Sequence, residues 1–168
     1  YYVNKSSLPK VYGGFNTSLS WKGFDLSAIF AYSIGGYIYN RDITMILHNG
    51  SLEGRDWSTE ILKRWTPDNR NTDVPALSTT TNNWNSASTR FLQNNSYMRL
   101  KNLTLSYNLP KQWISKLSLS SVQVYVQGDN LFTIHRNQGL DPEQGITGIT
   151  YYRYPAMRTI SGGINVSF

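Results

Sequence analysis

The side chains most able to do acid–base or metal chemistry are few in this chain and lie far apart. His48 and His135 are the only histidines among 168 residues, and the chain has no cysteine. A zinc site needs several nitrogen, sulfur or oxygen ligands at close spacing, and a catalytic base needs a partner within hydrogen-bond reach. Neither histidine has such a neighbour along the chain. We therefore expect no catalytic, cofactor-binding or metal-ligating residue, and no enzyme.

A pair of carboxylates in Asp141–Pro142–Glu143 is the next candidate for chemistry. Paired carboxylates can act as a general acid and base, and a calcium loop also uses carboxylate oxygens. This stretch lacks the alternating oxygen ligands of a calcium loop. The sequence also lacks a Gly-x-Ser-x-Gly motif, a phosphate-binding loop and a dinucleotide fingerprint. We expect the carboxylate pair to form a turn that organises its own loop.

Three tryptophans offer a different chemistry, because aromatic faces stack on sugar rings and anchor protein interfaces. Trp57, Trp65 and Trp84 all lie in one long stretch without a clear strand pattern. Three interpretations stay open for them: packing of the loop against itself, contact with a partner protein, and contact with a substrate.

The chain is basic, but the distribution of its charges does not predict binding to nucleic acid. There are 16 Lys and Arg against 10 Asp and Glu, a net charge of +6. The basic residues are spread from Lys5 to Arg158, and Lys63–Arg64 is the only adjacent pair. A phosphate-binding surface needs clustered basic side chains. We therefore expect no nucleic acid to bind.

The elements that hold these residues follow from a period of two in the hydrophobic pattern, which is typical of β-strands. Val11, Phe15, Leu19 and Trp21 share one face of the first such segment, and Lys22–Gly23 then forms a two-residue hairpin link. The predicted strands lie near 11–21, 24–36, 97–109, 121–130 and 157–168, and the long loops lie near 37–95 and 131–155.

Three properties of these strands predict a transmembrane β-barrel rather than a soluble sandwich. The alternating segments are about 9–11 residues long, which is the length that crosses a bilayer at a tilt. Their polar face is built from Asn, Ser, Thr and Gln with few charges. Short connections at one end of the strands alternate with long loops at the other, as in outer-membrane barrels. The expected fold class is all-β, with antiparallel transmembrane strands.

Four aromatic residues support this orientation. Trp21, Phe24, Tyr107 and Phe168 fall on the apolar face at the end that carries the short connections. Aromatic side chains gather at the interfaces between membrane and water. We expect Trp21, Phe24 and Tyr107 to mark such an interface, with outer-membrane lipid as the neighbour of the apolar face.

Five strands are too few to close a membrane barrel, because the smallest single-chain barrels have eight and an unpaired edge in lipid is very costly. We therefore expect this chain to be the C-terminal part of a longer protein. The absence of an initiator Met at Tyr1 agrees with a processed or truncated piece.

A series of short motifs resembles the C-terminal region of SusC/RagA-like TonB-dependent outer-membrane transporters. The blocks occur in the order and at the spacing of that family, and together they cover most of the chain. They lie at 9–15, 21–27, 64–69, 96–107, 128–132, 139–143, 154–155 and the terminal Phe168.

The resemblance implies a 22-stranded barrel whose last five strands are present here, and a cell outer membrane location. It also implies a plug domain and N-terminal strands outside this chain, a segment that contacts TonB in the missing N-terminal region, and a SusD-like surface lipoprotein as a partner. The imported substrates of the family are oligosaccharides or peptides. Phe168 resembles the C-terminal aromatic signal for barrel assembly.

Two other interpretations remain open at this stage. A passive porin-like barrel would share the strand pattern but would have no plug domain. A secreted all-β carbohydrate-binding module would use the loop tryptophans as a platform for sugars, and it would fold alone in water.

Overall fold

The computed structural model describes residues 3–48, 52–78, 80, 84, 86–115, 118–137, 139–143 and 145–168. The chain divides into two compact units, which are described separately below. The sheet unit consists of Pro9–Gly36, Asn95–Glu143 and Tyr154–Phe168. The loop unit consists of Tyr1–Leu8, Tyr37–Asn94 and Gln144–Arg153. Within the described ranges, no helix has the length and the apolar character needed to cross a membrane.

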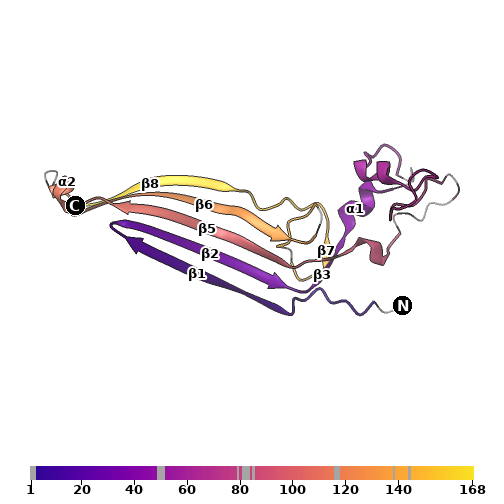
Figure 1. Ribbon diagram of the computed structural model, residues 1–168, viewed down its shortest axis with the longest axis horizontal. Coiled ribbons are helices and arrows are strands. Elements are labelled where there is room, and N and C mark those ends of the chain that lie inside the picture. The colour runs from indigo at the N-terminus through magenta and orange to yellow at the C-terminus, as the bar shows by residue number, and fades with distance from the viewer. Residues whose placement is uncertain are drawn as a thin grey trace. The chain divides into compact units, whose positions relative to one another are not determined.

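The sheet unit is a five-stranded antiparallel sheet in the order β1-β2-β5-β6-β8 (Figure 1). The strands are long because their apolar and polar residues alternate without interruption over most of their length. The fold class expected from the sequence, an all-β antiparallel sheet, is confirmed. The strands are β1 (Val11–Trp21), β2 (Phe24–Ile34), β5 (Tyr97–Asn108), β6 (Ser121–His135) and β8 (Thr159–Ser167).

Short connections lie at one end of this sheet. Lys22 and Gly23 have φ angles of 47° and 87°, and Trp21 pairs with Phe24 on either side of them. Two positive φ values in a two-residue link match the twist of a β-hairpin. The link from β5 to β6 contains the short helix α2 (Lys111–Ile114), which Figure 1 shows at the same end as the β1–β2 turn and the C-terminus.

A β-bulge interrupts the regular pairing of β5 with β6. The pairing of β5 with β6 shifts between Leu100 and Asn102, so that Lys101 of β5 lies opposite two residues of β6. One of these two, Asn130, has a φ of 52°. The bulge lets β6 continue to His135, so the expectation of a strand ending near residue 130 and a loop from residue 131 was wrong at this point.

The loop unit contains a small sheet of its own, in the order β4-β3-β7. Strand β3 (Tyr37–Asn40) pairs antiparallel with β4 (Leu92–Asn94) and parallel with β7 (Ile149–Thr150). The sequence placed residues 35–36 in the preceding strand, but positive φ angles of 84° at Gly35 and 77° at Gly36 end that strand. The predicted loop near 37–95 therefore contains secondary structure.

Short helices and a small apolar core complete the loop unit. Helix α1 (Arg41–Ile46) begins at Asn40, whose side chain accepts a hydrogen bond from the backbone N–H of Ile43 at 3.1 Å. A 3-10 helix (Thr59–Lys63) begins in the same way at Ser58, and another covers Thr89–Phe91. The buried apolar side chains of this core are Ile38, Leu47, Ile61, Val74 and Phe91.

Candidate functional site

One face of the sheet unit is a continuous apolar surface that faces outward. Residues that pair across the strands form apolar rows, and the row nearest the short connections is Trp21, Phe24, Tyr107, Val124 and Ile164. Trp21 and Ile164 are each 65% exposed. A water-soluble sheet would cover such a face with a second layer. Further exposed apolar residues on this face are Val11, Phe15, Leu19, Leu26, Leu105, Val126, Phe132, Ile134, Ile160 and Val166.

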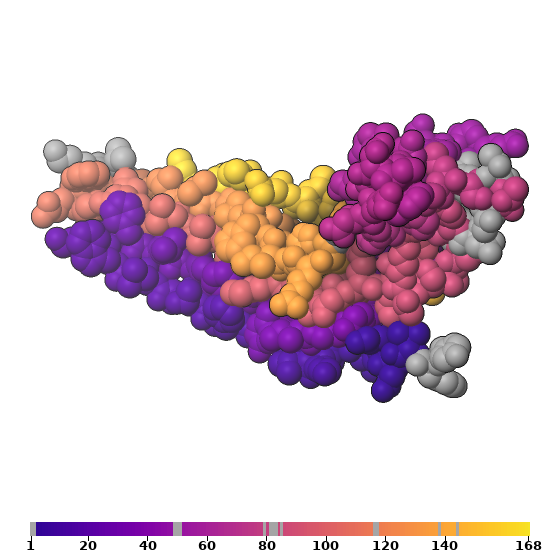
Figure 2. All heavy atoms as spheres, turned by 45° about the vertical axis from the view of Figure 1, so that its right-hand side comes forward, coloured from indigo at the N-terminus to yellow at the C-terminus, as the bar shows by residue number. Residues whose placement is uncertain are grey.

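The sheet unit buries little apolar surface inside itself. Within its described residues, the buried apolar side chains are Ala28 and Leu100 in the strands, Ile114 in α2 and Pro142 in the loop after β6. Figure 2 shows the indigo residues of β1 and the yellow residues of β8 along opposite borders of this layer. Exposed apolar patches of this extent mark a surface that meets a membrane or another protein.

The height of the apolar face matches the apolar band of an outer-membrane barrel. β1 spans 11 residues from Val11 to Trp21, and therefore ten residue steps. At about 3.4 Å per step the strand is roughly 34 Å long, and a tilt of about 40° reduces its height to roughly 26 Å. The lipid-facing band of such barrels is about 25 Å tall.

The opposite face of the sheet is polar, and its side chains bond to one another across the strands. The Asn102 amide donates to the Asp129 carboxylate at 2.7 Å, and the Asn165 amide donates to Gln123 at 3.2 Å. Gln123 in turn donates to the Ser106 hydroxyl at 3.3 Å. A face made of such hydrogen-bonded polar groups suits the water-filled interior of a barrel.

A glycine on β8 leaves room for a tyrosine that lies across this polar face. A Cβ atom placed on Gly163 would lie 2.7 Å from the hydroxyl oxygen of Tyr125, which is its pairing partner on β6. An aromatic ring packed over a glycine on the next strand helps to fix the register of the pair. Any larger residue at position 163 would displace the ring.

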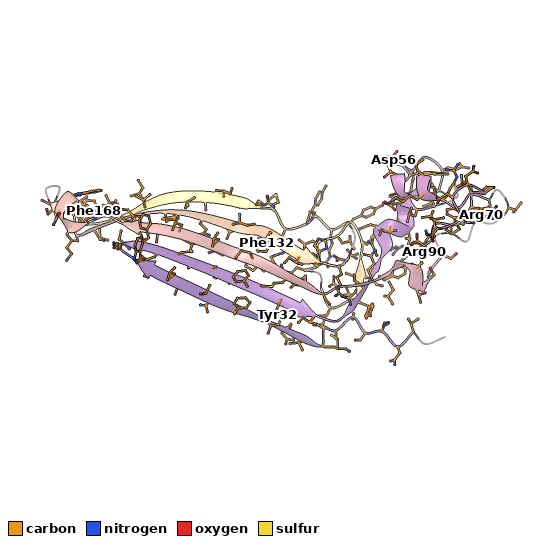
Figure 3. The ribbon with its side chains drawn as sticks, viewed as in Figure 1. Tyr32, Asp56, Arg70, Arg90, Phe132 and Phe168 are labelled. Carbon is orange, nitrogen blue, oxygen red and sulfur yellow. The ribbon has the colours of Figure 1, made fainter. Side chains whose placement is uncertain are left out.

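The structure places the predicted interface aromatics at one end of the apolar face. The rings of Phe24 and Tyr107 have centroids 4.5 Å apart, and Trp21 pairs directly with Phe24. Phe168 is 92% exposed and lies at the same end of the sheet unit (Figure 3). Their roles at a membrane interface and in barrel assembly stay predictions.

The carboxylates of Asp141–Pro142–Glu143 bind a nearly buried arginine of β5. Arg99 donates to Asp141 and, at 2.7 Å, to Glu143, and its side chain is 4% exposed. Lys101 forms an ion pair with Glu143, and Arg99 also donates to the Thr133 hydroxyl at 2.9 Å. We call Arg99, Lys101, Asp141 and Glu143 the Arg99 cluster.

Asp141 also accepts hydrogen bonds from two backbone N–H groups at the ends of one segment. The N–H of Glu143 donates to it at 2.9 Å and that of Ala156 at 2.7 Å. Burial raises the pKa of Asp141, but these two hydrogen bonds and Arg99 outweigh it and hold the pKa below its ordinary value. The carboxylate therefore links the backbone at Glu143 to the backbone at Ala156 within the sheet unit.

Of the histidines and tryptophans singled out in the sequence, His48 and Trp57 contact each other in the loop unit. The buried ring of His48 lies edge-on to Trp57 at 5.2 Å, and the Nδ1 atom of His135 lies 2.8 Å from the carbonyl oxygen of Asn137. Trp57 and Trp65 are partly exposed, and Trp84 is half-buried. Among the described residues, no group of three or more acidic or histidine side chains could hold a metal ion.

A second polar cluster lies in the loop unit, and the sequence analysis missed it. Arg55 donates to the hydroxyl oxygen of Tyr152 at 3.2 Å, and the Tyr151 and Tyr152 rings have centroids 4.0 Å apart. Hydrogen bonds with Tyr151 and with Arg55 lower the pKa of Tyr152. The aromatic run at residues 151–154 is the only sequence signal for this cluster, because its partners lie about 100 residues away.

Comparisons with known proteins show that the chain is similar to TonB-dependent receptors. It is 35% identical over 166 residues to TonB-dependent receptor P3 of Formosa agariphila, covering 92% of this chain and 16% of the relative. It is 27% identical over 168 residues to TonB-dependent receptor SusC of Bacteroides thetaiotaomicron, covering 99% of this chain and 16% of the relative. No protein-family model matches the chain.

A solved structure shows the same fold at similar identity. The structure described as the RagAB peptide importer in the "open-open" state matches with a TM-score of 0.85 and 35% identity. The match covers 99% of this chain and 18% of that chain. This chain thus spans about one sixth of the length of the curated relatives it matches. The named relatives are receptors and importers, not enzymes.

Proposed function

Because this chain is homologous over nearly all its residues to SusC/RagA-like TonB-dependent receptors, we propose that it forms part of the wall of an outer-membrane nutrient transporter. In this proposal the strands are five of a 22-stranded barrel, and the transporter imports oligosaccharides or peptides. The similar solved structure is a peptide importer, which supports peptides, and oligosaccharides follow from the resemblance to the SusC/RagA family.

The observation that carries the proposal is the exposed apolar face of the sheet unit. The apolar row from Trp21 to Ile164 runs through all five strands, and the opposite face carries a hydrogen-bonded polar surface. Lipid outside and water inside account for both faces at once. A secreted carbohydrate-binding module would need a second layer over this face.

The partners in this proposal follow from the same homology. We propose a plug and a TonB-contacting segment in the part of the longer protein outside this chain, and a SusD-like surface lipoprotein on the external side. The likeness to SusC and to the RagAB structures supports the lipoprotein partner. Trp57, Trp65 and Trp84 are candidates for contact with that partner or with substrate.

Fractionation of the source cells tests the proposal. An antibody against residues 68–78, which form a largely exposed stretch of the loop unit, reports the native polypeptide. We expect a band several times larger than this chain, confined to the outer membrane, whose mobility changes on heating because the folded barrel resists detergent. A soluble band at the mass of 168 residues would contradict the proposal and favour the secreted module.

The energy dependence of substrate uptake distinguishes a passive porin-like barrel from an active transporter. We expect uptake of the substrate to stop in cells that lack TonB, because the relatives are TonB-dependent receptors. Uptake that is unchanged without TonB would favour the passive barrel.

A further inference from the structure

An open hollow in the loop unit brings together side chains from three separate stretches of the chain. Its volume is about 420 Å³, within the range of ligand pockets in proteins. One stretch is helix α1, another follows Gly54, and the third is the aromatic run after β7. The side chains that matter here are Asp42, Met45, Ile46, Arg55, Asp56 and Tyr152.

Tyr152 lies at the edge of this hollow and makes two contacts with distant parts of the chain. Its φ angle is 49°, a conformation that is uncommon for a bulky residue. Its backbone N–H donates to the Asp42 carboxylate at 3.0 Å, and its hydroxyl oxygen accepts from Arg55 at 3.2 Å. The two contacts reach residues 110 and 97 positions away in the sequence. The local sequence alone does not impose this conformation; contacts from distant segments support it.

Tyr152 is nevertheless an exposed residue. It is 64% exposed, so it contributes little to the core of the loop unit. The neighbouring Tyr151 ring packs against its ring at an interplanar angle of 43°, and the Arg41 guanidinium lies 4.6 Å from the centre of the Tyr151 ring. An aromatic residue that neighbouring groups position and that stays exposed to solvent is already arranged for a ligand.

The groups around the hollow select a class of ligand. Met45 and Ile46 give it an apolar part. The carboxylates of Asp42 and Asp56 accept hydrogen bonds, and the guanidinium of Arg55 donates them. With the Arg41 guanidinium beside the Tyr151 ring, the four charged groups sum to zero, which favours a ligand without net charge. A neutral sugar offers weakly positive C–H groups to an aromatic face and hydroxyl groups to both kinds of polar partner.

We propose that this hollow is a binding subsite for a neutral oligosaccharide, with Tyr152 as the stacking platform and Arg55, Asp42 and Asp56 as hydrogen-bonding partners. The proposal rests on the import function proposed above, because it selects oligosaccharides from the two substrate classes named there. It adds a location outside the barrel strands and a preference for uncharged sugars.

The test uses the full-length protein purified from the outer membrane. An array of immobilised neutral, uronic-acid-containing and sulfated oligosaccharides is probed first, and titration calorimetry then measures the affinity for the neutral sugar that binds best. Tyr152→Ala removes the platform. Tyr154→Ala is the matched control, because Tyr154 is 97% exposed and does not line the hollow. We expect Tyr152→Ala to weaken binding about tenfold and Tyr154→Ala to change it less than twofold.

A second variant guards against misfolding of the first. Asp56→Asn keeps the shape of the side chain and is expected to weaken binding about threefold. Binding that is equal in wild type, Tyr152→Ala and Asp56→Asn would overturn the proposal, and so would binding of charged sugars alone or of no sugar at all. Heat-dependent mobility and membrane location are recorded on the same samples. A folded outer-membrane barrel without sugar binding refutes this subsite alone, whereas absence from the outer membrane refutes the proposed function.

Discussion

A charged residue on the apolar face of β8 gives a sharp test of which face meets lipid. Ile160 pairs with Gly128 and is 71% exposed on the apolar face. Its neighbour Ser161 pairs with Gln127 on the polar face. Ile160→Arg and Ser161→Arg therefore introduce the same side chain at adjacent positions, on opposite faces of one strand.

The expected magnitude follows from the position of Ile160 in the sheet. Its row passes through Leu103 and Ala28 to Thr17, which lies four residues from Trp21 on β1. At about 2.6 Å of height per residue in a tilted strand, this row lies roughly 10 Å from the aromatic end, close to the middle of a 25 Å band. An arginine at the midplane of a barrel costs about 2–4 kcal/mol.

The assay is urea unfolding of the full-length protein in lipid vesicles, followed by the heat-dependent change in mobility. Ile160→Arg should lower the free energy of unfolding by about 2–4 kcal/mol, a change of roughly 30-fold to 1,000-fold in the folding equilibrium. Ser161→Arg should lower it by less than about 1 kcal/mol, because that face is hydrated. Equal losses for the two variants, or a larger loss for Ser161→Arg, would refute the assignment of the faces.

Three further predictions concern the Arg99 cluster and the end of β8. Arg99→Met should lower the free energy of unfolding by about 3–5 kcal/mol, since it leaves the buried Asp141 carboxylate without its ion-pair partner; a loss below about 1 kcal/mol in urea unfolding would contradict this. Because the pKa of Asp141 is lowered in the folded protein, its contribution should be complete above about pH 4 and lost as the pH falls through the folded pKa; unfolding at pH 7 and pH 3 should show a smaller difference for Asp141→Asn than for wild type. Deleting Phe168 should lower the outer-membrane level of the full-length protein, whereas Phe168→Tyr should preserve it; immunoblots of membrane fractions that show equal levels for all three would argue against an assembly role.

The regular parts of the sheet could be predicted from local sequence because their pattern is local. β1 covers the residues expected from alternation, and Lys22–Gly23 supplies the positive φ angles that its hairpin needs. The polar and apolar faces follow directly, since successive side chains point to opposite sides of a strand. A membrane environment stays a prediction, based on uncharged polar residues that alternate with apolar residues over long strands.

The bulge at Lys101 could not be predicted from the alternation of polar and apolar residues. Leu103 and Leu100 lie on the same face although they are three residues apart, because Lys101 is an extra residue of β5 in its pairing with β2 and shifts the alternation. The same shift brings Arg99 to the polar face together with Asn102. A period-two pattern cannot show where a strand adds a residue. On β6 the alternation stays in phase from Gly128 to Phe132 and Ile134, and the prediction ended that strand too early.

The Arg99 cluster and the Arg55–Tyr152 cluster could not be predicted from local sequence for a different reason. Arg99 meets Asp141 across 42 residues, and Tyr152 meets Asp42 across 110 residues. The sequence did indicate that Asp141–Pro142–Glu143 forms a turn rather than a catalytic pair. It gave no sign of the partners, because residues this distant are brought together only by the pairing of the strands between them.

The most direct measurement of the central account is the lipid exposure of two adjacent residues on the central strand β5. Leu105 lies on the apolar face, in a row with Leu26 and Val126, and Thr104 lies on the polar face. This chain has no cysteine, so a single cysteine at either position can carry a bimane fluorophore once any cysteine elsewhere in the longer protein is replaced. In vesicles of brominated lipid, we expect strong quenching of the fluorophore at position 105 and little at position 104. Equal quenching at both positions, or stronger quenching at position 104, would contradict a lipid-facing apolar surface.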